Sequence, residues 1–104
     1  MIAVGPVVRH AVDAADYPAR LRALESPPSD VWVRGPLPAA DRPAVAIVGT
    51  REATGYGVRV AQELAAAFAR AGVVVVSGLA RGIDAAAHRG ALDVGGTTTA
   101  VVGG

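Results

Sequence analysis

Two short segments of the sequence combine glycine, a hydroxyl group and arginine: Gly49-Thr50-Arg51 and Ser77-Gly78-Leu79-Ala80-Arg81-Gly82. Glycine lets a ligand approach the main chain closely, and the planar guanidinium of arginine can bind phosphate through two parallel hydrogen bonds. Where a helix follows such a segment, its first turn adds free N–H donors. The pattern predicts an anion site. Because glycine-rich turns also precede helices for geometric reasons alone, a turn without a ligand is the alternative.

Two well-known phosphate-binding motifs are excluded. The P-loop needs four residues between its glycines and then Gly-Lys-Ser/Thr, whereas five residues separate Gly49 from Gly55 and the chain has no lysine. The dinucleotide fingerprint needs Gly-x-Gly-x-x-Gly, and Arg51 stands where its second glycine belongs. An NAD-dependent dehydrogenase is therefore disfavoured.

Other residues that could do chemistry have simpler interpretations. Asp84 and His88 are four residues apart, on one face of a predicted helix, where a first-turn acid and a locally bonded histidine are favoured over a catalytic or metal site. Trp32 and Tyr17 could stack on bases, but core anchoring is the preferred role. The chain has no cysteine, which excludes disulfides, thiolate zinc sites and a cysteine nucleophile.

The elements that would position the two segments follow a regular alternation. Apolar runs predict buried parallel strands, and a 3.6-residue periodicity predicts helices between them. The expected order is strand 44–48, helix 56–71, strand 73–76, helix 83–92 and strand 98–102. The helix over 56–71 has an apolar stripe formed by Ala61, Leu64, Ala65 and Phe68. Gly72 is expected to end that helix in a left-handed conformation.

This order predicts an α/β fold: an incomplete Rossmann-like, doubly wound parallel sheet with three main strands and two crossover helices. Ligands of such sheets bind outside the carboxyl ends of the strands. That edge would hold both glycine–arginine segments and Gly103-Gly104. Strand 45–48 would be central in a complete sheet and would have an unpaired edge in this chain.

A short lead-in, residues 1–43, precedes this sheet. All seven prolines lie before residue 44 and eleven of thirteen glycines lie after residue 48, which places a boundary near Pro43. Within the lead-in, residues 8–24 have helical character after Pro18, residues 31–33 form a short strand, and residues 36–43 form a loop. Residues 44–104 would then be the first half of a Rossmann-like domain.

Composition limits the function classes. Hydrophobic residues make up 52% and charged residues 18% of the 104 residues, which excludes a disordered, highly charged chain. The net charge is +1, so no overall basic field attracts nucleic acid. All ten basic residues are arginine. The apolar run 71–80 is too short to cross a membrane, and the first eight residues lack a basic start, so a cytoplasmic protein without a membrane partner is expected.

These motifs together resemble the DNA-processing protein A family (DprA, also called Smf). The resemblance rests on residues 45–51, 55–57, 76–84, 87–88, 90–92 and 96–97, and upstream on Tyr17-Pro18, Leu21, Pro27-Pro28 and Val33-Arg34-Gly35. It implies single-stranded DNA binding and loading of the RecA recombinase in natural transformation, by a homodimer with no cofactor and no catalytic step. The implied DNA-binding residues are Gly49, Thr50, Arg51, Ser77, Gly78, Arg81 and Gly82, with Asp84 and His88 as structural support.

The sequence departs from the family pattern in extent. The family's helical N-terminal module is absent, and the chain stops at Gly103-Gly104, where the family continues through a second half of the sheet. Two other interpretations stay open. One is a nucleotide-binding enzyme of the related phosphoribohydrolase superfamily, whose catalytic signature would fall after residue 104. The other is a truncated, non-functional remnant.

Overall fold

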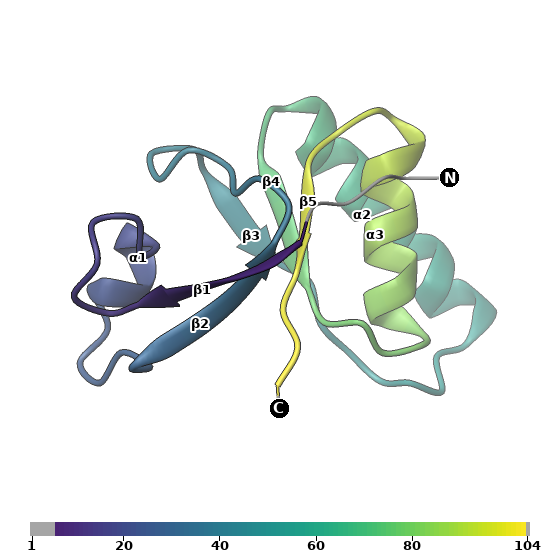
Figure 1. The fold of residues 1–104 in the computed structure, drawn as a ribbon. Coiled ribbons are helices and arrows are strands. Elements are labelled where there is room, and N and C mark those ends of the chain that lie inside the picture. The colour runs from purple at the N-terminus through teal and green to yellow at the C-terminus, as the bar shows by residue number, and fades with distance from the viewer. Residues whose placement is uncertain (1–5, 104) are drawn as a thin grey trace. The chain divides into compact units, whose positions relative to one another are not determined.

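The computed structural model describes residues 6–103, and the chain divides into two compact units, residues 1–40 and 41–104. The first contains a two-stranded ribbon and one turn of helix, and the second contains a three-stranded sheet with two helices (Figure 1).

The ribbon of the first unit is antiparallel. It pairs β1 (Val7–Ala11) with β2 (Asp30–Arg34), so that Val7 lies opposite Arg34 and Ala11 opposite Asp30. The short helix α1 (Ala19–Arg22) lies between the two strands in sequence. Beside it, the Tyr17 side chain is 3% exposed and its hydroxyl donates to the carbonyl oxygen of Pro28 at 2.8 Å. Tyr17 therefore anchors this unit, as expected.

Two expectations for the lead-in need correction. Residues 8–24 were expected to have helical character after Pro18; Ala19–Arg22 is helical, as expected, but residues 8–11 belong to the strand β1. The partner of β1 begins 19 residues after it ends, and local periodicity gives no sign of such a distant pairing. Trp32 was expected to be a core anchor, yet 65% of its surface is exposed. Alternation along β2 turns Trp32 away from Val31 and Val33, which are partly buried.

The second unit is built on a parallel sheet with the order β3-β4-β5. Its strands are β3 (Ala44–Ala46), β4 (Val74–Ser77) and β5 (Thr98–Ala100). The helix α2 (Gly55–Arg70) connects β3 to β4, and α3 (Ile83–Asp93) connects β4 to β5. The predicted fold class is confirmed. In this three-stranded sheet β3 is an edge strand and β4 is central.

Both helices cover the same face of the sheet and pack against each other (Figure 1). Successive right-handed crossovers between adjacent parallel strands place them there. The buried core is made of Ala65, Val75, Ala87 and Ala91. Gly90 of α3 lies so close to α2 that a Cβ atom on it would overlap the main chain of Gln62. Alanine and glycine therefore let the two helices approach closely.

This close approach also changes which side chains of α2 are buried. Of the predicted apolar stripe, Ala61 and Ala65 are buried, whereas Leu64 is 48% and Phe68 37% exposed. The contact with α3 runs along the small residues, so the large side chains of the stripe lie at its margin. Gly72 follows α2 with φ 83°, the left-handed conformation predicted for it.

Arg42 helps to explain where the second unit begins. Its guanidinium donates to Thr97 Oγ1 at 3.1 Å and to the carbonyl oxygen of Gly72 at 3.0 Å, and the Val74 N–H donates to the Pro43 carbonyl at 2.8 Å. Residues 41–43, assigned to the lead-in by the sequence pattern, thus group with the sheet. Within residues 6–103, no helix is long and apolar enough to span a membrane.

Candidate nucleic-acid interface

The two glycine–arginine segments meet at the edge where β3 and β4 end, called here the carboxyl edge. The N–H of Ile83 donates to the carbonyl oxygen of Thr50 at 3.2 Å. Gly82 has φ 80°, and a Cβ atom on it would overlap that same oxygen. A Cβ atom on Gly49 would lie 2.7 Å from Cγ1 of Ile83. Glycine is required at 82 because its main chain touches that of Thr50, and at 49 because its main chain lies against the Ile83 side chain.

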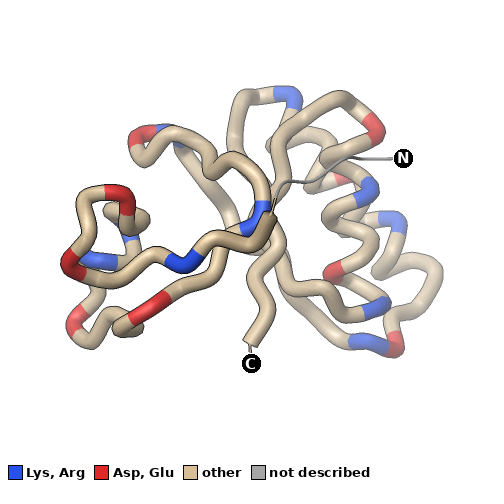
Figure 2. The backbone as a smooth tube through the Cα atoms, in the orientation of Figure 1, with Lys and Arg blue, Asp and Glu red and all other residues tan. Residues whose placement is uncertain are grey.

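Two arginines project from this edge. Arg51 is exposed, and the side chain of Arg81 is 74% exposed. One terminal nitrogen of Arg81 lies 3.6 Å from a carboxylate oxygen of Glu52, whose side chain is 85% exposed. Ion pairs this exposed contribute about 0–1 kcal/mol, so Arg81 can exchange Glu52 for a phosphate at little cost. Figure 2 shows the basic and acidic positions of both loops at one end of the unit.

The helix N-termini at this edge have few free donors. Thr54 caps α2, its Oγ1 accepting the Gly57 N–H at 3.0 Å. At α3, the Ile83 N–H is bonded to Thr50, and Asp84 puts a carboxylate in the first turn. An anion therefore meets fewer free donors than at an open helix N-terminus. If an anion binds at this edge, the arginines would supply most of the attraction.

Ser77 lies beneath the edge rather than on it. The residue is 3% exposed, and its hydroxyl donates to the carbonyl oxygen of Ile47 at 2.6 Å. The hydroxyl thus joins β4 to the end of β3. Because the whole residue is buried, Ser77 supports the edge from beneath.

Asp84 and His88 both reach Gly78. A Cβ atom on Gly78 would lie 2.6 Å from Oδ2 of Asp84, which is buried. His88 Nε2 lies 2.7 Å from the Gly78 carbonyl oxygen, and Nδ1 lies 2.6 Å from Oγ1 of Thr98. Because a carbonyl oxygen only accepts, Nε2 carries the proton in that contact. The two side chains thus connect the loop after β4 to α3 and β5.

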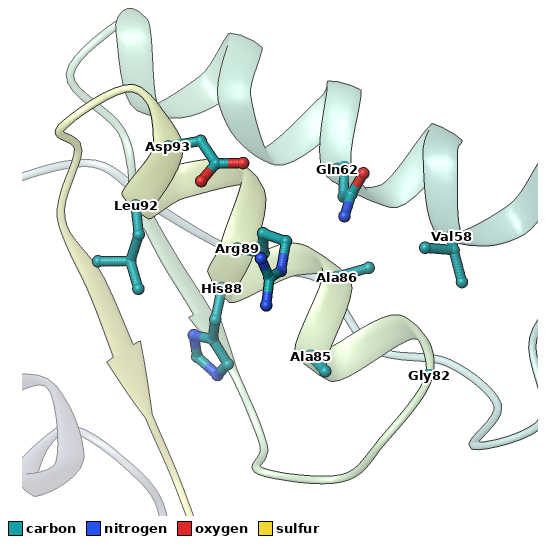
Figure 3. Close-up of a pocket in the computed structure, with 9 residues that line it drawn as sticks. All are labelled: Val58, Gln62, Gly82, Ala85, Ala86, His88, Arg89, Leu92 and Asp93. Carbon is teal, nitrogen blue, oxygen red and sulfur yellow. The ribbon is translucent and has the colours of Figure 1, made fainter.

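A shallow groove of about 640 Å³ runs between α2 and α3 (Figure 3). Its lining residues are Val58, Gln62, Gly82, Ala85, Ala86, His88, Arg89, Leu92 and Asp93. Of the predicted DNA-binding residues, only Gly82 belongs to this lining. Figure 3 also shows the ring of His88 on the side of α3 away from α2. The predicted anion site is therefore an open surface beside this groove.

Comparison with known families decides the assignment. The family described as DNA recombination-mediator protein A matches residues 9–104. The chain belongs to this family. Among its relatives, the putative DNA processing protein DprA of Mycobacterium tuberculosis is 51% identical, and the alignment covers 83% of this chain and 23% of the relative. The protein Smf of Escherichia coli is 41% identical, with coverages of 88% and 24%.

A solved structure agrees with the family assignment. The X-ray structure of DNA processing protein A from Streptococcus pneumoniae matches with a TM-score of 0.80 and 34% identity, covering 91% of this chain and 33% of the other. The chain thus spans about a quarter to a third of the length of the DprA and Smf proteins it matches.

Two residues of this DprA-family edge were not singled out from the sequence. Glu52 is the acidic neighbour of Arg81, and Ile83 joins the two loops through its N–H and its side chain. Glu52 directly follows Arg51 and could have been included in the segment on that ground. The role of Ile83 depends on a contact across 33 residues, which no spacing indicates.

Proposed function

We propose that this chain binds single-stranded DNA through its carboxyl edge, as the part of a DNA recombination mediator that holds the backbone of the strand. One observation carries the proposal. The main-chain contact between the loops brings the exposed Arg51 and Arg81 to the same edge of the sheet. In a member of this family, two exposed guanidiniums on one edge suit the phosphates of a DNA strand.

The expected mode of binding is independent of base sequence. Phosphate contacts position a strand but do not read its bases. Close main-chain approach would come from Gly49, Thr50, Gly78 and Gly82. Ser77 would contribute by holding β4 to the end of β3. Asp84 and His88 would support the loop after β4 and would not touch the DNA.

The further steps concern a whole DprA-type protein. There the bound strand would be handed to the RecA recombinase during natural transformation, in the cytoplasm, by a homodimer. The chain spans a quarter to a third of its relatives, so these partners and their surfaces are proposed for the longer protein. We further propose that binding involves no catalytic step and no cofactor.

The test is a titration of the chain with a fluorescently labelled oligo(dT) over a range of salt concentrations. Arg51→Ala and Arg81→Ala should each weaken binding, and each should reduce the log–log salt slope by about 0.7, the value for one lost phosphate contact with a single strand. Arg70→Gln is the matched control, because Arg70 is exposed at the opposite end of α2. Circular dichroism would confirm that each variant is folded.

Unchanged slopes in both folded variants would contradict the proposed site. The enzyme interpretation is tested separately. The chain, at a protein concentration that saturates DNA binding, is incubated with nucleoside monophosphates. Release of free base would contradict the proposal that the protein only binds.

A further inference from the structure

The ribbon of the first unit has one face that the proposed DNA site does not use. In the register of β1 and β2, Arg9 lies directly opposite Trp32, and Val7 lies opposite Arg34. Side chains two residues apart on a strand point to the same side. Arg9, Trp32 and Arg34 therefore share one face with Asp30, called here the ribbon face.

An indole on this face is open to solvent. Trp32 is 65% exposed, although tryptophan is buried on average and exposed aromatic surface has a hydration cost. The other aromatic side chain of this unit, Tyr17, is 3% exposed and has a hydrogen-bond partner. The core of the unit thus uses Tyr17, and Trp32 remains available for a ligand.

Two guanidiniums flank the indole. Directly opposite residues on paired strands have Cβ atoms about 5 Å apart, and two residues along one strand span about 7 Å, so both arginines lie within side-chain reach of Trp32. Nε of Arg9 donates to Oδ1 of Asp30 at 2.6 Å, which orients the guanidinium and leaves its terminal nitrogens as donors. Within residues 6–103, Arg34 is exposed and has no ion pair.

We propose that the ribbon face binds single-stranded nucleic acid, with Trp32 stacking on an unpaired base and with Arg9 and Arg34 contacting the flanking phosphates. An exposed aromatic ring with arginines beside it is complementary to a flat base and its anionic phosphates. A duplex does not fit, because its bases are already stacked and paired. This inference rests on the proposed function and adds to it a base contact on a different unit of the chain.

The chain contains a single tryptophan, so its emission reports on Trp32 alone. Oligo(dT) should quench this emission strongly, whereas an abasic oligomer of equal length, which has phosphates but no bases, should quench it little. Trp32→Ala should weaken oligo(dT) binding about tenfold, within the range for one lost stacked base. Trp32→Phe, which keeps an aromatic face, should stay within about threefold of the unmodified chain. Arg34→Gln should reduce the salt slope by about 0.7.

Three results would overturn this inference: equal quenching by the abasic oligomer, no loss of affinity in folded Trp32→Ala, or no quenching in a chain that binds oligo(dT). If Trp32→Ala does not fold, the quenching of the unmodified chain and the affinity of Trp32→Phe show whether Trp32 stacks on a base. The proposed edge site fails separately if Arg51→Ala and Arg81→Ala keep their salt slopes while Trp32→Ala loses affinity. No binding of oligo(dT) at all would overturn both.

Discussion

The main-chain N–H of Ile83 donates a hydrogen bond to the carbonyl oxygen of Thr50, 3.2 Å away. This bond joins the first residue of α3 to the loop that follows β3. Gly82 and Gly49 allow the contact because neither has a side chain to separate the two segments. The loops that carry Arg51 and Arg81 are therefore held together by main-chain geometry rather than by an interaction between the two arginines.

Gly82→Ala should destabilise the second unit. The methyl group would overlap the Thr50 carbonyl oxygen, and φ 80° is strained for any residue with a Cβ atom. The expected loss is about 1–3 kcal/mol in the free energy of unfolding, measured by urea denaturation. Gly55→Ala is the matched control, because a Cβ atom there meets open space at the first residue of α2. Equal stability of the two variants would show that the loops are not in contact.

Gly90→Ala tests the packing of the two helices. Alanine is favoured over glycine inside a helix by about 1 kcal/mol, but here its methyl group would overlap the main chain of Gln62. We expect the overlap to dominate, with a net loss of about 1–3 kcal/mol on urea denaturation. Ala67→Leu adds volume at an exposed position of α2 and should change stability little. A stabilised Gly90→Ala variant would contradict the close approach of α2 and α3.

His88→Ala distinguishes a structural role of His88 in supporting the loop from a direct contact of His88 with DNA. It removes the hydrogen bonds to Gly78 and Thr98, so the free energy of unfolding should fall by about 1–3 kcal/mol. If the carboxyl edge binds DNA as proposed, affinity should fall modestly because the loop carrying Arg81 loosens, while the salt slope should stay unchanged. A slope reduced as much as in Arg81→Ala would indicate that His88 itself contacts phosphate.

Glu52→Gln should increase the affinity for single-stranded DNA. Glu52 lies 3.6 Å from Arg81 and competes with a phosphate for it. Removing a pair this exposed should raise affinity about two- to fivefold, which corresponds to less than about 1 kcal/mol. Glu63→Gln on α2 is the control for the change in net charge. An equal gain in both variants would mean that overall charge, and not competition for Arg81, sets the affinity.

The sheet and its helices could be predicted because a local sequence pattern indicates each of these elements. Four consecutive valines at 73–76 indicate a buried strand, and the glycine at 72 ends the preceding helix. The strand over residues 31–33 was predicted, but its pairing with β1 was not, since β1 and β2 stabilise each other across a separation that periodicity does not cover. For the same reason the exposure of Trp32 was missed. Its neighbours Val31 and Val33 indicate a strand, but not which face is covered.

For the candidate site, the sequence predicted which loops come together but not how their side chains are arranged. Parallel strands end at one edge, so the two arginine segments had to come together. The direction of Ser77 was missed although it follows from strand alternation, which places residue 77 on the same side as the buried Val75. The contact between Arg81 and Glu52 could not be predicted from the sequence, because the two residues belong to different loops.

The small-residue core described above has a thermodynamic consequence. Among residues 6–103, Val75 is the largest side chain buried almost completely. Burying alanine and glycine costs no side-chain rotamer entropy, but it also releases little ordered water. The second unit must therefore depend heavily on short-range dispersion between closely spaced main chains, which weakens steeply when a gap of 0.5–1 Å opens. It should tolerate the loss of any one large side chain better than the addition of a single methyl group at Gly90.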